Sequence, residues 1–501
     1  MLYTSGEKDV QSKIEREILR TSEDITHYPL GLAYLYSVLE KEGHELQLLS
    51  LANNDEDDCD DKVKAALKSF APDIVCFQIL SFNRVSSFRM IEYIHTTYPR
   101  IDQVIGGIHT TIMYEQILTK YPYAIAVLGE GELTISDLVK ELTLPDRSLS
   151  RVDGIAFYEN SAVTVTKPRE LISDLDAIPF PKHEIFFKGK RTTGAILTTR
   201  GCPSRCSFCC LKSISRGRVR LRSVSNIIEE IREMIKKFPK MTEIFILDDT
   251  FFIDNQRVIK FCDEIIRLKI KINFSCNARV KPLNEEMAEK LERANFKRIY
   301  FGIESGDDKI LEKCHKGITR EDIIRAYRLF SKTKIHVAPF LIIGLPGETI
   351  DSILKTCDLL KKLQKIKYAP DCDQVGLLKI FPGTEVYEIA KTSGLMDDTY
   401  WLTDRPIPIF TVENSLDRLK YYEKVFSYHT SQVTAFCTWT GFKAQFFLIP
   451  YHLRFIFSST TNLKFFLIRV IKFSLPSETY ERLKKRWKLF FYKLSAPENR
   501  T

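Results

Sequence analysis

Short apolar runs alternate with amphipathic stretches along most of the chain. After residue 190, six apolar runs bounded by turn residues predict strands, at 195–202, 243–250, 272–279, 298–305, 336–348 and 373–385. Stretches with helical periodicity separate them, for example SVSNIIEEIREMIKKF at 223–238. These strand–helix units predict an open, partial (β/α)6 barrel over residues 191–400, with functional side chains at the carboxyl ends of the strands.

The first third of the chain repeats this alternation in a different form. Residues 27–51 predict a helix followed by a strand, and residues 71–82, 102–111 and 123–134 predict further strand-and-loop units. This is an α/β pattern, and it predicts a doubly wound, Rossmann-type domain over residues 1–150, followed by a linker at 151–190. Glycines that follow these strands would let a bulky planar or phosphate-bearing group approach the backbone.

The C-terminal region, residues 401–501, is predicted to be basic and helical. The net charge is +9, and residues 441–501 hold twelve Lys and Arg but only three acidic residues. Charges and Pro450 interrupt every apolar run there, so no membrane span is predicted. We expect a helical cap that closes the barrel. The alternative is an interfacial helix, in which RLKKRWKLFFYKL (482–494) contacts an anionic membrane surface; nucleic acid is the less favoured partner.

The composition indicates an intracellular compartment. The opening stretch MLYTSGEKDVQSKIEREILR is polar throughout and has no secretory apolar region. Twelve cysteines in a chain of 501 residues are expected to be metal ligands or buried thiols rather than disulfides. We therefore expect a cytoplasmic protein, with peripheral contact to the inner face of the membrane if the basic tail binds lipid.

Four of the cysteines lie within nine residues, in the sequence RGCPSRCSFCC at 200–210. Cys202, Cys206 and Cys209 have the spacing C-x3-C-x2-C, whereas Cys210 directly follows Cys209 and would point away from a shared metal. Structural zinc is usually bound by four ligands, which makes zinc the weaker interpretation. A cubane iron–sulfur cluster bound by three thiolates leaves one iron open to a further ligand.

This stretch, with the aromatic Phe208 before the last ligand, resembles the cluster loop of radical S-adenosylmethionine (SAM) enzymes. The resemblance implies that Cys202, Cys206 and Cys209 bind a 4Fe–4S cluster and that its open iron binds SAM. An electron from a donor such as flavodoxin or ferredoxin then generates a 5'-deoxyadenosyl radical. Residues at the strand ends would lie around SAM, namely Phe208, Asp248, Asp249, Arg279, Glu304, Ser305, Gly344 and Gly347.

The first 190 residues carry a second resemblance, to the cobalamin-binding domain and linker of cobalamin-dependent radical SAM enzymes. It rests on PLGLAYL, PDIV, GGIHTT, GEGE, DGIAFYEN and DLDAIPFPKHEIF in that order, and the whole resemblance covers residues 25–400. No D-x-H-x-x-G segment supplies a histidine below the cobalt, so base-off binding is implied, with His109 as a hydrogen-bonding residue. The corrinoid would lie over Gln78, Ser81, Phe82, Gly106, Gly107, His109, Gly129, Glu130 and Gly131.

One departure concerns the start of the chain. MLYTSGEKD is a poor match for the apolar first strand with which such domains usually open. This departure leaves open an incomplete corrinoid pocket.

These resemblances imply radical chemistry at an unactivated carbon of a small-molecule or lipid-like substrate. Methyl transfer by way of cobalamin is the leading expectation. The alternatives are a radical oxidative cyclase and a carbon–carbon coupling enzyme in which the N-terminal domain is only a scaffold. An alternative of another class is a non-catalytic, metal-stabilised binding protein whose basic tail contacts membrane or nucleic acid.

Overall fold

The fold is known from a computed structural model, which describes residues 2–5, 29–51, 56–187, 191–367 and 375–435. The described residues up to Thr430 belong to one compact unit. The alternatives for the basic tail, a helical cap or an interfacial helix within 436–501, lie outside the described residues.

The N-terminal sheet has seven strands in the order β2-β1-β3-β4-β5-β6-β7. The first five pair in parallel, which gives the doubly wound order 2-1-3-4-5, and β6 and β7 continue the sheet in antiparallel orientation. Their bounds are β1 Leu2–Ser5, β2 Leu48–Leu51, β3 Ile74–Gln78, β4 Asp102–Gly106, β5 Ala124–Val127, β6 Ile155–Glu159 and β7 Ala162–Val165.

The start of the chain does form the first strand, although its sequence is a poor match for one. β1 pairs with β2 along four residues and with β3 along two, so hydrogen bonding to two neighbours compensates for weak apolar character. The sheet also extends past residue 150, because β6 and β7 lie in the range predicted to be a linker.

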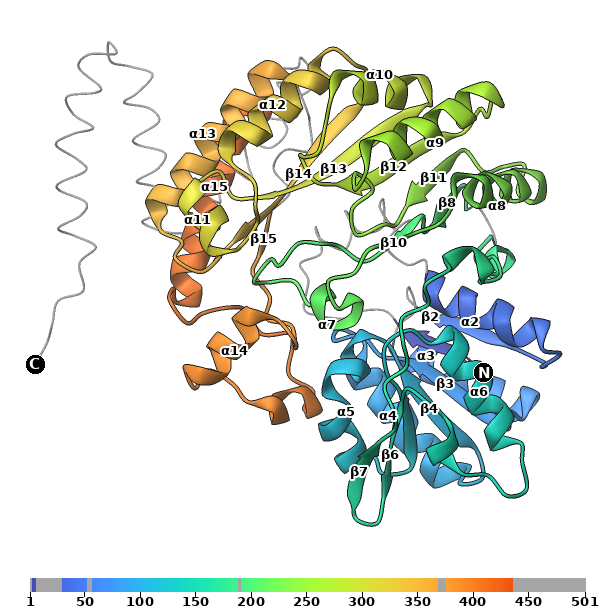
Figure 1. The fold of residues 1–501 in the computed structure, drawn as a ribbon. Helices are drawn as coiled ribbons and strands as arrows, with labels where there is room; N and C mark the ends of the chain where they lie inside the picture. Colours follow the sequence, from blue (N-terminus) through green and yellow to red (C-terminus); the bar gives the residue numbers. More distant parts are fainter. Residues whose placement is uncertain (1, 6–28, 52–55, 188–190, 368–374, 436–501) are drawn as a thin grey trace, which may run out of the picture. The chain divides into compact units, whose positions relative to one another are not determined.

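Helices connect the parallel strands of this domain (Figure 1). They are α2 Leu30–Lys41, α3 Glu56–Phe70, α4 Arg84–Thr97, α5 Ile108–Lys120 and α6 Glu132–Leu142. α4, α5 and α6 each begin within a few residues of the end of a strand, so the loops between them meet at the carboxyl edge of the sheet. In an open parallel sheet this edge is where ligands bind.

The second sheet contains six parallel strands in the order β15-β14-β13-β12-β11-β8, and this confirms the partial barrel. The strands are β8 Thr193–Ile196, β11 Glu243–Ile246, β12 Asn273–Ala278, β13 Phe296–Glu304, β14 His336–Ile343 and β15 Val375–Leu377. The helices lie along the outer face of the curved sheet, as Figure 1 shows for α8 Val224–Lys237, α9 Asn255–Arg267, α10 Glu285–Arg293, α12 Arg320–Ser331 and α13 Ile350–Ile366.

The barrel helices begin at residues whose side chains cap them. Thr319 and Thr349 each form a capping box at the start of α12 and α13, and Asp254 accepts hydrogen bonds from two backbone amides at the start of α9. These caps satisfy amide groups that have no partner within the helix. The polar residues that follow the apolar strands in the sequence therefore mark where each helix begins.

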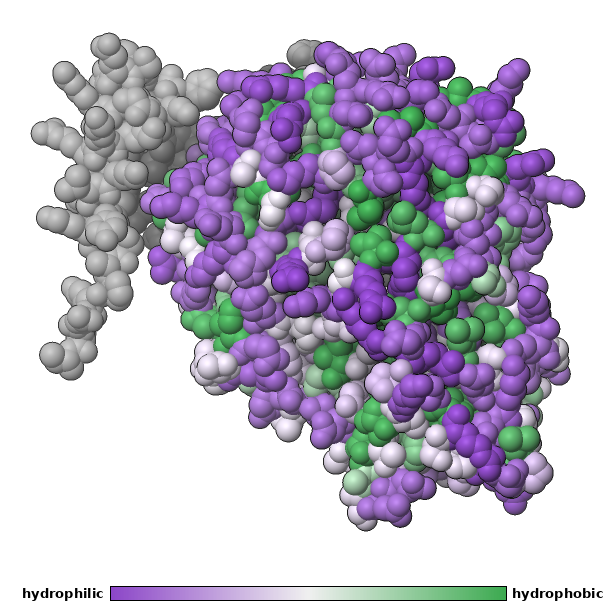
Figure 2. Space-filling model, viewed as in Figure 1, coloured by the Kyte–Doolittle hydropathy of each residue, from purple (hydrophilic) through white to green (hydrophobic). Residues whose placement is uncertain are grey.

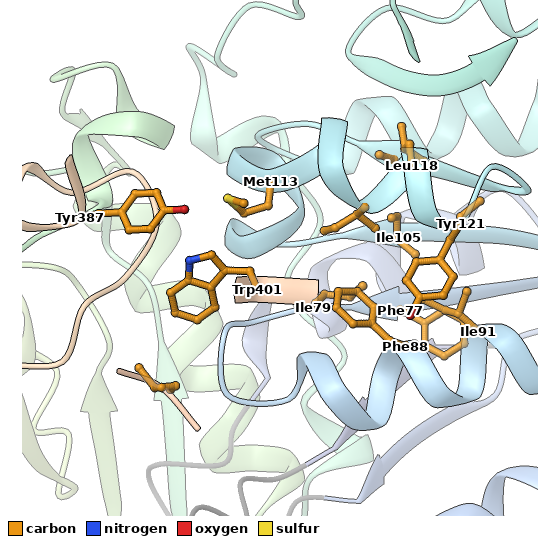
Figure 3. Close-up of a cluster of buried hydrophobic side chains, with 14 of the residues drawn as sticks. Phe77, Ile79, Phe88, Ile91, Ile105, Met113, Leu118, Tyr121, Tyr387 and Trp401 are labelled. Atoms are coloured by element: carbon orange, nitrogen blue, oxygen red, sulfur yellow. The ribbon is translucent and has the colours of Figure 1, made fainter. Parts of the chain in front are cut away.

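A single hydrophobic core joins the N-terminal domain to the segment that follows the barrel (Figure 3). In this core Phe77, Ile105 and Met113 of the N-terminal domain share one cluster with Tyr387 and Trp401. Tyr387 belongs to α14 (Glu385–Thr392), and Trp401 to the short helix η4 (Asp398–Leu402). Because Trp401 has no exposed surface, the two parts share one interior.

The surface of the described part is predominantly hydrophilic on the face that Figure 2 shows, with apolar residues in small separate groups. Among the helices that the structure describes, none has both the length and the apolar character required to cross a membrane. The last of them is α15, Leu416–Ala435.

Candidate functional site

The predicted cluster loop is held at its two ends by a short pair of antiparallel strands. β9 (Thr199–Arg200) pairs with β10 (Arg220–Leu221), and residues 201–219 form the loop between them, with the single short helix α7 (Leu211–Ser215). Cys202, Cys206 and Cys209 lie on this loop as free thiols that are at least partly exposed. In the described residues, no three Cys, His, Asp or Glu side chains are already arranged as a metal site.

The donor set nevertheless fits an iron–sulfur cluster. Three thiols at the spacing 4 and 3 lie on an accessible loop that follows a parallel strand. Although Cys209 is an exposed residue, partial desolvation and the neighbouring thiols of Cys210 and Cys206 raise the pKa of its thiol to about 11, and binding of a metal would release the proton. A three-thiolate site would leave one iron for a ligand that the protein does not supply.

Two consecutive aspartates at the end of β11 fasten this loop. Asp248 is fully buried and accepts hydrogen bonds from the backbone amides of Thr198 and Thr199 at 2.6 and 3.1 Å. Asp249 accepts one from the amide of Gly201 at 3.2 Å. Asp249 is an exposed residue, yet partial desolvation by the surrounding protein, with the charge of Asp248 beside it, raises the pKa of its carboxyl to about 6.

The far side of the loop is held through Ser207. Its amide donates to the carbonyl of Cys314 at 3.1 Å, and its carbonyl accepts from the amide of Val386 at 3.1 Å. Asp248, Asp249, Cys314 and Val386 therefore bind the loop from three different parts of the fold. Backbone hydrogen bonds of this kind fix the loop without using the cysteine sulfurs.

Lys316 connects three of the residues predicted to lie around SAM. Its ammonium is 2.8 Å from the Glu304 carboxylate and 5.9 Å from the centroid of the Phe208 ring, and its carbonyl accepts from the guanidinium of Arg279. Glu304 and Lys316 are both buried. The backbone of Glu304 has a φ of +64°, a conformation that non-glycine residues seldom adopt. The structure thus brings Phe208, Arg279 and Glu304 together around a lysine that the sequence analysis missed.

The remaining predicted SAM residues lie nearby but have structural partners. Ser305 is fully buried and its hydroxyl accepts from the amide of Asp307 at 3.2 Å. Gly344 and Gly347 form the turn after β14 with φ values of +95° and +82°, which favour glycine. The amide of Gly344 donates to Glu348 at 2.5 Å, and burial raises the pKa of Glu348 to about 8.

A cavity of about 230 Å³ lies at the carboxyl edge of the N-terminal sheet. Six of the nine residues predicted to contact a corrinoid line it, namely Gln78, Gly106, Gly107, Gly129, Glu130 and Gly131. Gly107 has a φ of +101°, and a Cβ there would lie 2.7 Å from the carbonyl of Ile79. Gly107 therefore lets the backbone pack closely against Ile79, and the space beside Gly129 is open, since a Cβ there would meet nothing within 4 Å.

The other three predicted corrinoid residues do not line this cavity. His109 is buried, its Nδ1 lies 3.0 Å from the Ser81 hydroxyl, and its ring lies edge-on to Trp401 at 5.4 Å. Burial, together with the charge of Arg84, lowers the pKa of His109 to about 3, so it is neutral. Phe82 is 40% exposed. His109 thus packs against Trp401 of η4 and is hydrogen-bonded to Ser81, and neither residue lines this cavity.

Glu130 lies between the cavity and the cluster loop. Its two carboxylate oxygens are 3.1 Å from Arg200 and 2.6 Å from Arg220, and it also accepts from the amide of Ile172 at 2.9 Å. Arg200 reaches Glu132 as well, at 2.5 Å. Glu130 is too far from Arg200 and Arg220 along the chain for their pairing to be predicted from the sequence.

The comparisons with known proteins agree with this arrangement. The model described as "B12 binding domain" matches residues 17–139, and the model described as "Radical SAM superfamily" matches residues 196–360. An uncharacterized methyltransferase from Pyrococcus horikoshii is 32% identical over 379 residues, which cover 74% of this chain and 80% of that protein. The anaerobic magnesium-protoporphyrin IX monomethyl ester cyclase of Rubrivivax gelatinosus is 26% identical, over 72% of this chain and 66% of the cyclase.

Solved structures show the same fold at low identity. The cobalamin-dependent SAM radical enzyme OxsB has a TM-score of 0.66 at 19% identity, over 97% of this chain and 78% of OxsB. The radical SAM methyltransferase TsrM from Kitasatospora setae has a TM-score of 0.61 at 20% identity, over 79% and 78% of the two chains. The chain belongs to the cobalamin-dependent radical SAM enzymes.

This relationship confirms the predicted fold class, the radical SAM enzyme class, and the iron–sulfur cluster, SAM and cobalamin as the cofactors of the family. The chain is therefore an enzyme, and the alternative of a non-catalytic binding protein is not supported. The individual contacts to SAM and to the corrinoid remain predictions.

Proposed function

We propose that this enzyme transfers a methyl group to an unactivated carbon of a small-molecule substrate. The observation that carries the proposal is that Leu197 and Arg200, which lead into the cluster loop, also line the corrinoid-type cavity. The two cofactor regions therefore share a wall. Relatives with methyltransferase names support the same chemistry, among them the protein from Pyrococcus horikoshii and the cytidylyl-2-hydroxyethylphosphonate methyltransferase of Streptomyces wedmorensis, which is 24% identical.

The bound groups would supply a carbon-centred radical oxidant from SAM and the cluster, and a methyl donor from cobalamin. Cys202, Cys206 and Cys209 would hold the cluster. The glycines around the cavity would accommodate the corrinoid face. Because no D-x-H-x-x-G segment is present and His109 is buried against Trp401, the protein offers no histidine from this position to the cobalt.

The residues at the barrel strand ends would position SAM. The free side of Asp249 is the carboxylate best placed to accept from an ammonium group, since Asp248 is already occupied by Thr198 and Thr199. Lys316 neutralises Glu304 and fixes the Phe208 and Arg279 side chains around it. These residues would bind and orient SAM, and they would not exchange protons with it.

Radical oxidative cyclisation is the second candidate, because the Rubrivivax gelatinosus cyclase matches 72% of this chain. Carbon–carbon coupling, with the N-terminal domain as a scaffold, is the third. The three reactions differ in product mass. Methylation adds one carbon, ring closure adds none, and coupling joins two substrate chains.

Two partners belong to the same proposal. A flavodoxin or ferredoxin would supply the electron for SAM cleavage. In the alternative to the helical cap, the basic and aromatic segment 482–494 would form an interfacial helix and bring the enzyme to the inner face of the membrane, which would suit a lipid-like substrate.

The test is an anaerobic reaction of the reconstituted enzyme with dithionite, hydroxocobalamin and SAM that carries an isotopic label in its methyl group. Small-molecule and lipid extracts would serve as the substrate source, and products would be followed by mass spectrometry. Methyl transfer predicts a product that carries the label. An unlabelled product that has lost hydrogen would favour the cyclase, and a product built from two substrate chains would favour coupling.

A further inference from the structure

The two ends of the cluster loop meet at a pair of like charges. Arg200 and Arg220 are directly opposite each other in the β9–β10 pair, and all nineteen residues of the loop, 201–219, lie between them. We call this pair the neck of the cluster loop. Like charges directly opposite each other across paired strands are destabilising. The neck therefore needs a negative charge from another part of the fold.

That charge comes from the corrinoid-type domain. Each carboxylate oxygen of Glu130 contacts one of the two guanidinium groups, at 3.1 Å for Arg200 and 2.6 Å for Arg220. Arg220 also donates to the carbonyl of Ile172 at 2.8 Å, while the amide of Ile172 donates to Glu130. Glu132 adds a second carboxylate on the Arg200 side.

These charges are withdrawn from water. The side chains of Arg200, Arg220 and Glu130 are 15%, 12% and 10% exposed. Burial alone would raise the pKa of Glu130, but the hydrogen bond from Arg220 and the charge of Arg200 hold it below its usual range. Loss of the Glu130 carboxylate would leave two buried guanidinium groups with Glu132 as the remaining carboxylate beside them, whereas loss of Arg220 would leave Glu130 paired with Arg200.

The neck is also tightly packed. A Cβ on Gly201 would lie 2.1 Å from the carbonyl oxygen of Arg218, so the two strands of the loop run against each other just inside the neck. A small displacement of Arg200 or Arg220 would therefore be passed to the loop that carries Cys202, Cys206 and Cys209.

We propose that Glu130 is a positioning residue for the cluster: its carboxylate, inserted from the corrinoid-type domain between Arg200 and Arg220, holds the neck of the cluster loop closed. Glu130 and the glycines on either side of it line the corrinoid-type cavity, and both carboxylate oxygens of Glu130 are used by the neck. One loop thus serves both cofactor regions. Only the consequence for cobalamin rests on the proposed function; the neck itself concerns SAM cleavage, a property of the family.

The experiment compares Glu130→Gln, Arg220→Gln and the double variant with wild type after anaerobic reconstitution. The readouts are iron content, the electron paramagnetic resonance spectrum of the reduced cluster with SAM, the rate of 5'-deoxyadenosine formation with dithionite, and the affinity for hydroxocobalamin from its visible absorption. No substrate is needed. Arg218→Gln is the matched control, because Arg218 lies in the same loop next to the neck, and among the described residues its side chain forms an ion pair only with the exposed Glu170, at 3.8 Å.

Glu130→Gln leaves two buried like charges opposed, so the rate of 5'-deoxyadenosine formation should fall about tenfold or more and the spectrum with SAM should change. Removal of the second charge should relieve this repulsion. The double variant should therefore recover to within about threefold of wild type, and Arg220→Gln alone should cost no more than about threefold. Arg218→Gln should stay within about twofold.

A double variant slower than Glu130→Gln would overturn the proposal, because no repulsion would then be relieved. A Glu130→Gln variant that loses hydroxocobalamin affinity but keeps the rate of SAM cleavage would also overturn it, and would make Glu130 a corrinoid contact. If Glu130→Gln does not fold, Arg220→Gln still tests the proposal. A fall of tenfold or more in its rate of 5'-deoxyadenosine formation would contradict repulsion between Arg200 and Arg220. Absence of a methylated product from wild type would count against the proposed function and leave the neck unaffected.

Discussion

The ammonium of Lys316 lies 2.8 Å from the carboxylate of Glu304, and both side chains are buried at the carboxyl ends of the barrel strands. Around this ion pair the structure gathers Phe208 from the cluster loop and Arg279 from the end of β12. A buried ion pair at the edge of the cluster loop gives this part of the barrel a fixed geometry before any ligand binds. The strand-end residues are therefore positioned by the protein itself.

Replacement of Lys316 by Met should leave the Glu304 carboxylate buried without a partner. We expect the free energy of unfolding to fall by about 3 kcal/mol, with weaker SAM binding in the variant that remains folded. Denaturant titration and equilibrium binding of SAM measure the two effects. Lys309→Met, at an exposed position on α11 (Asp308–Lys313), is the control and should change stability by less than about 0.5 kcal/mol. Equal effects of the two substitutions would contradict the role of the buried pair.

Alanine substitutions should distinguish the three cysteines of the C-x3-C-x2-C spacing from Cys210, which is not expected to bind the cluster. Cys206→Ala should abolish cluster retention and 5'-deoxyadenosine formation while the melting temperature stays within a few degrees of wild type, because backbone hydrogen bonds fasten the loop. Cys210→Ala should keep both iron and SAM cleavage. Iron analysis and chromatography of the nucleoside product are sufficient. A cluster that survives in Cys206→Ala, or is lost in Cys210→Ala, would show that the ligand set is different.

The buried carboxyl of Glu348 should make stability depend on pH. Its pKa is about 8 in the folded protein, above the ordinary value, so the folded state holds a proton that the unfolded chain releases. The contribution of Glu348 to the free energy of unfolding should therefore be fully present below about pH 4.5 and be lost as the pH rises from there through 8, by up to about 1.4 kcal/mol per pH unit. Glu348→Gln should lose this dependence, and denaturation at several pH values compares the two. Parallel pH profiles would rule out Glu348 as the titrating group.

Trp401 should be essential to the contact between the N-terminal domain and the segment after the barrel. Its ring lies 5.1 Å from the guanidinium of Arg84 and 5.4 Å from the ring of His109, and it has no exposed surface. Trp401→Ala should destabilise the protein by about 3–5 kcal/mol and increase hydrogen exchange in residues 79–84 and 108–113. Leu395→Ala, at a 43% exposed position, is the control. Unchanged exchange in those segments would contradict a shared core.

The apolar pattern predicted the six barrel strands and the N-terminal strands β2 to β5, because strand-end glycines and helix caps are local features of the sequence. It did not predict β6 and β7, which lie in the range expected to be a linker. The first strand shows the limit of this reasoning. Leu2–Ser5 has weak apolar character, and its place between β2 and β3 depends on pairing with strands more than forty residues away.

The site was predicted in part, for similar reasons. The cluster cysteines form a local motif. Asp248 and Ser305 are buried and hydrogen-bonded within the protein, and their contact with SAM stays a prediction. Lys316 lies in the polar stretch CHKG, which is typical of an exposed turn, so the sequence does not indicate that its side chain is buried. The neck joins Glu130 to Arg200 and Arg220, seventy and ninety residues away, and no periodicity in the chain encodes such a pairing.

The central claim is that one enzyme uses an iron–sulfur cluster with SAM and also binds cobalamin. Anaerobic purification with iron, sulfide and corrinoid analysis, followed by dithionite and SAM, would measure this with 5'-deoxyadenosine as the readout. We predict about four irons per chain, bound cobalamin and 5'-deoxyadenosine. Iron and 5'-deoxyadenosine without corrinoid would contradict methyl transfer through cobalamin, and a sample that contains zinc and forms no 5'-deoxyadenosine would contradict the radical chemistry as a whole.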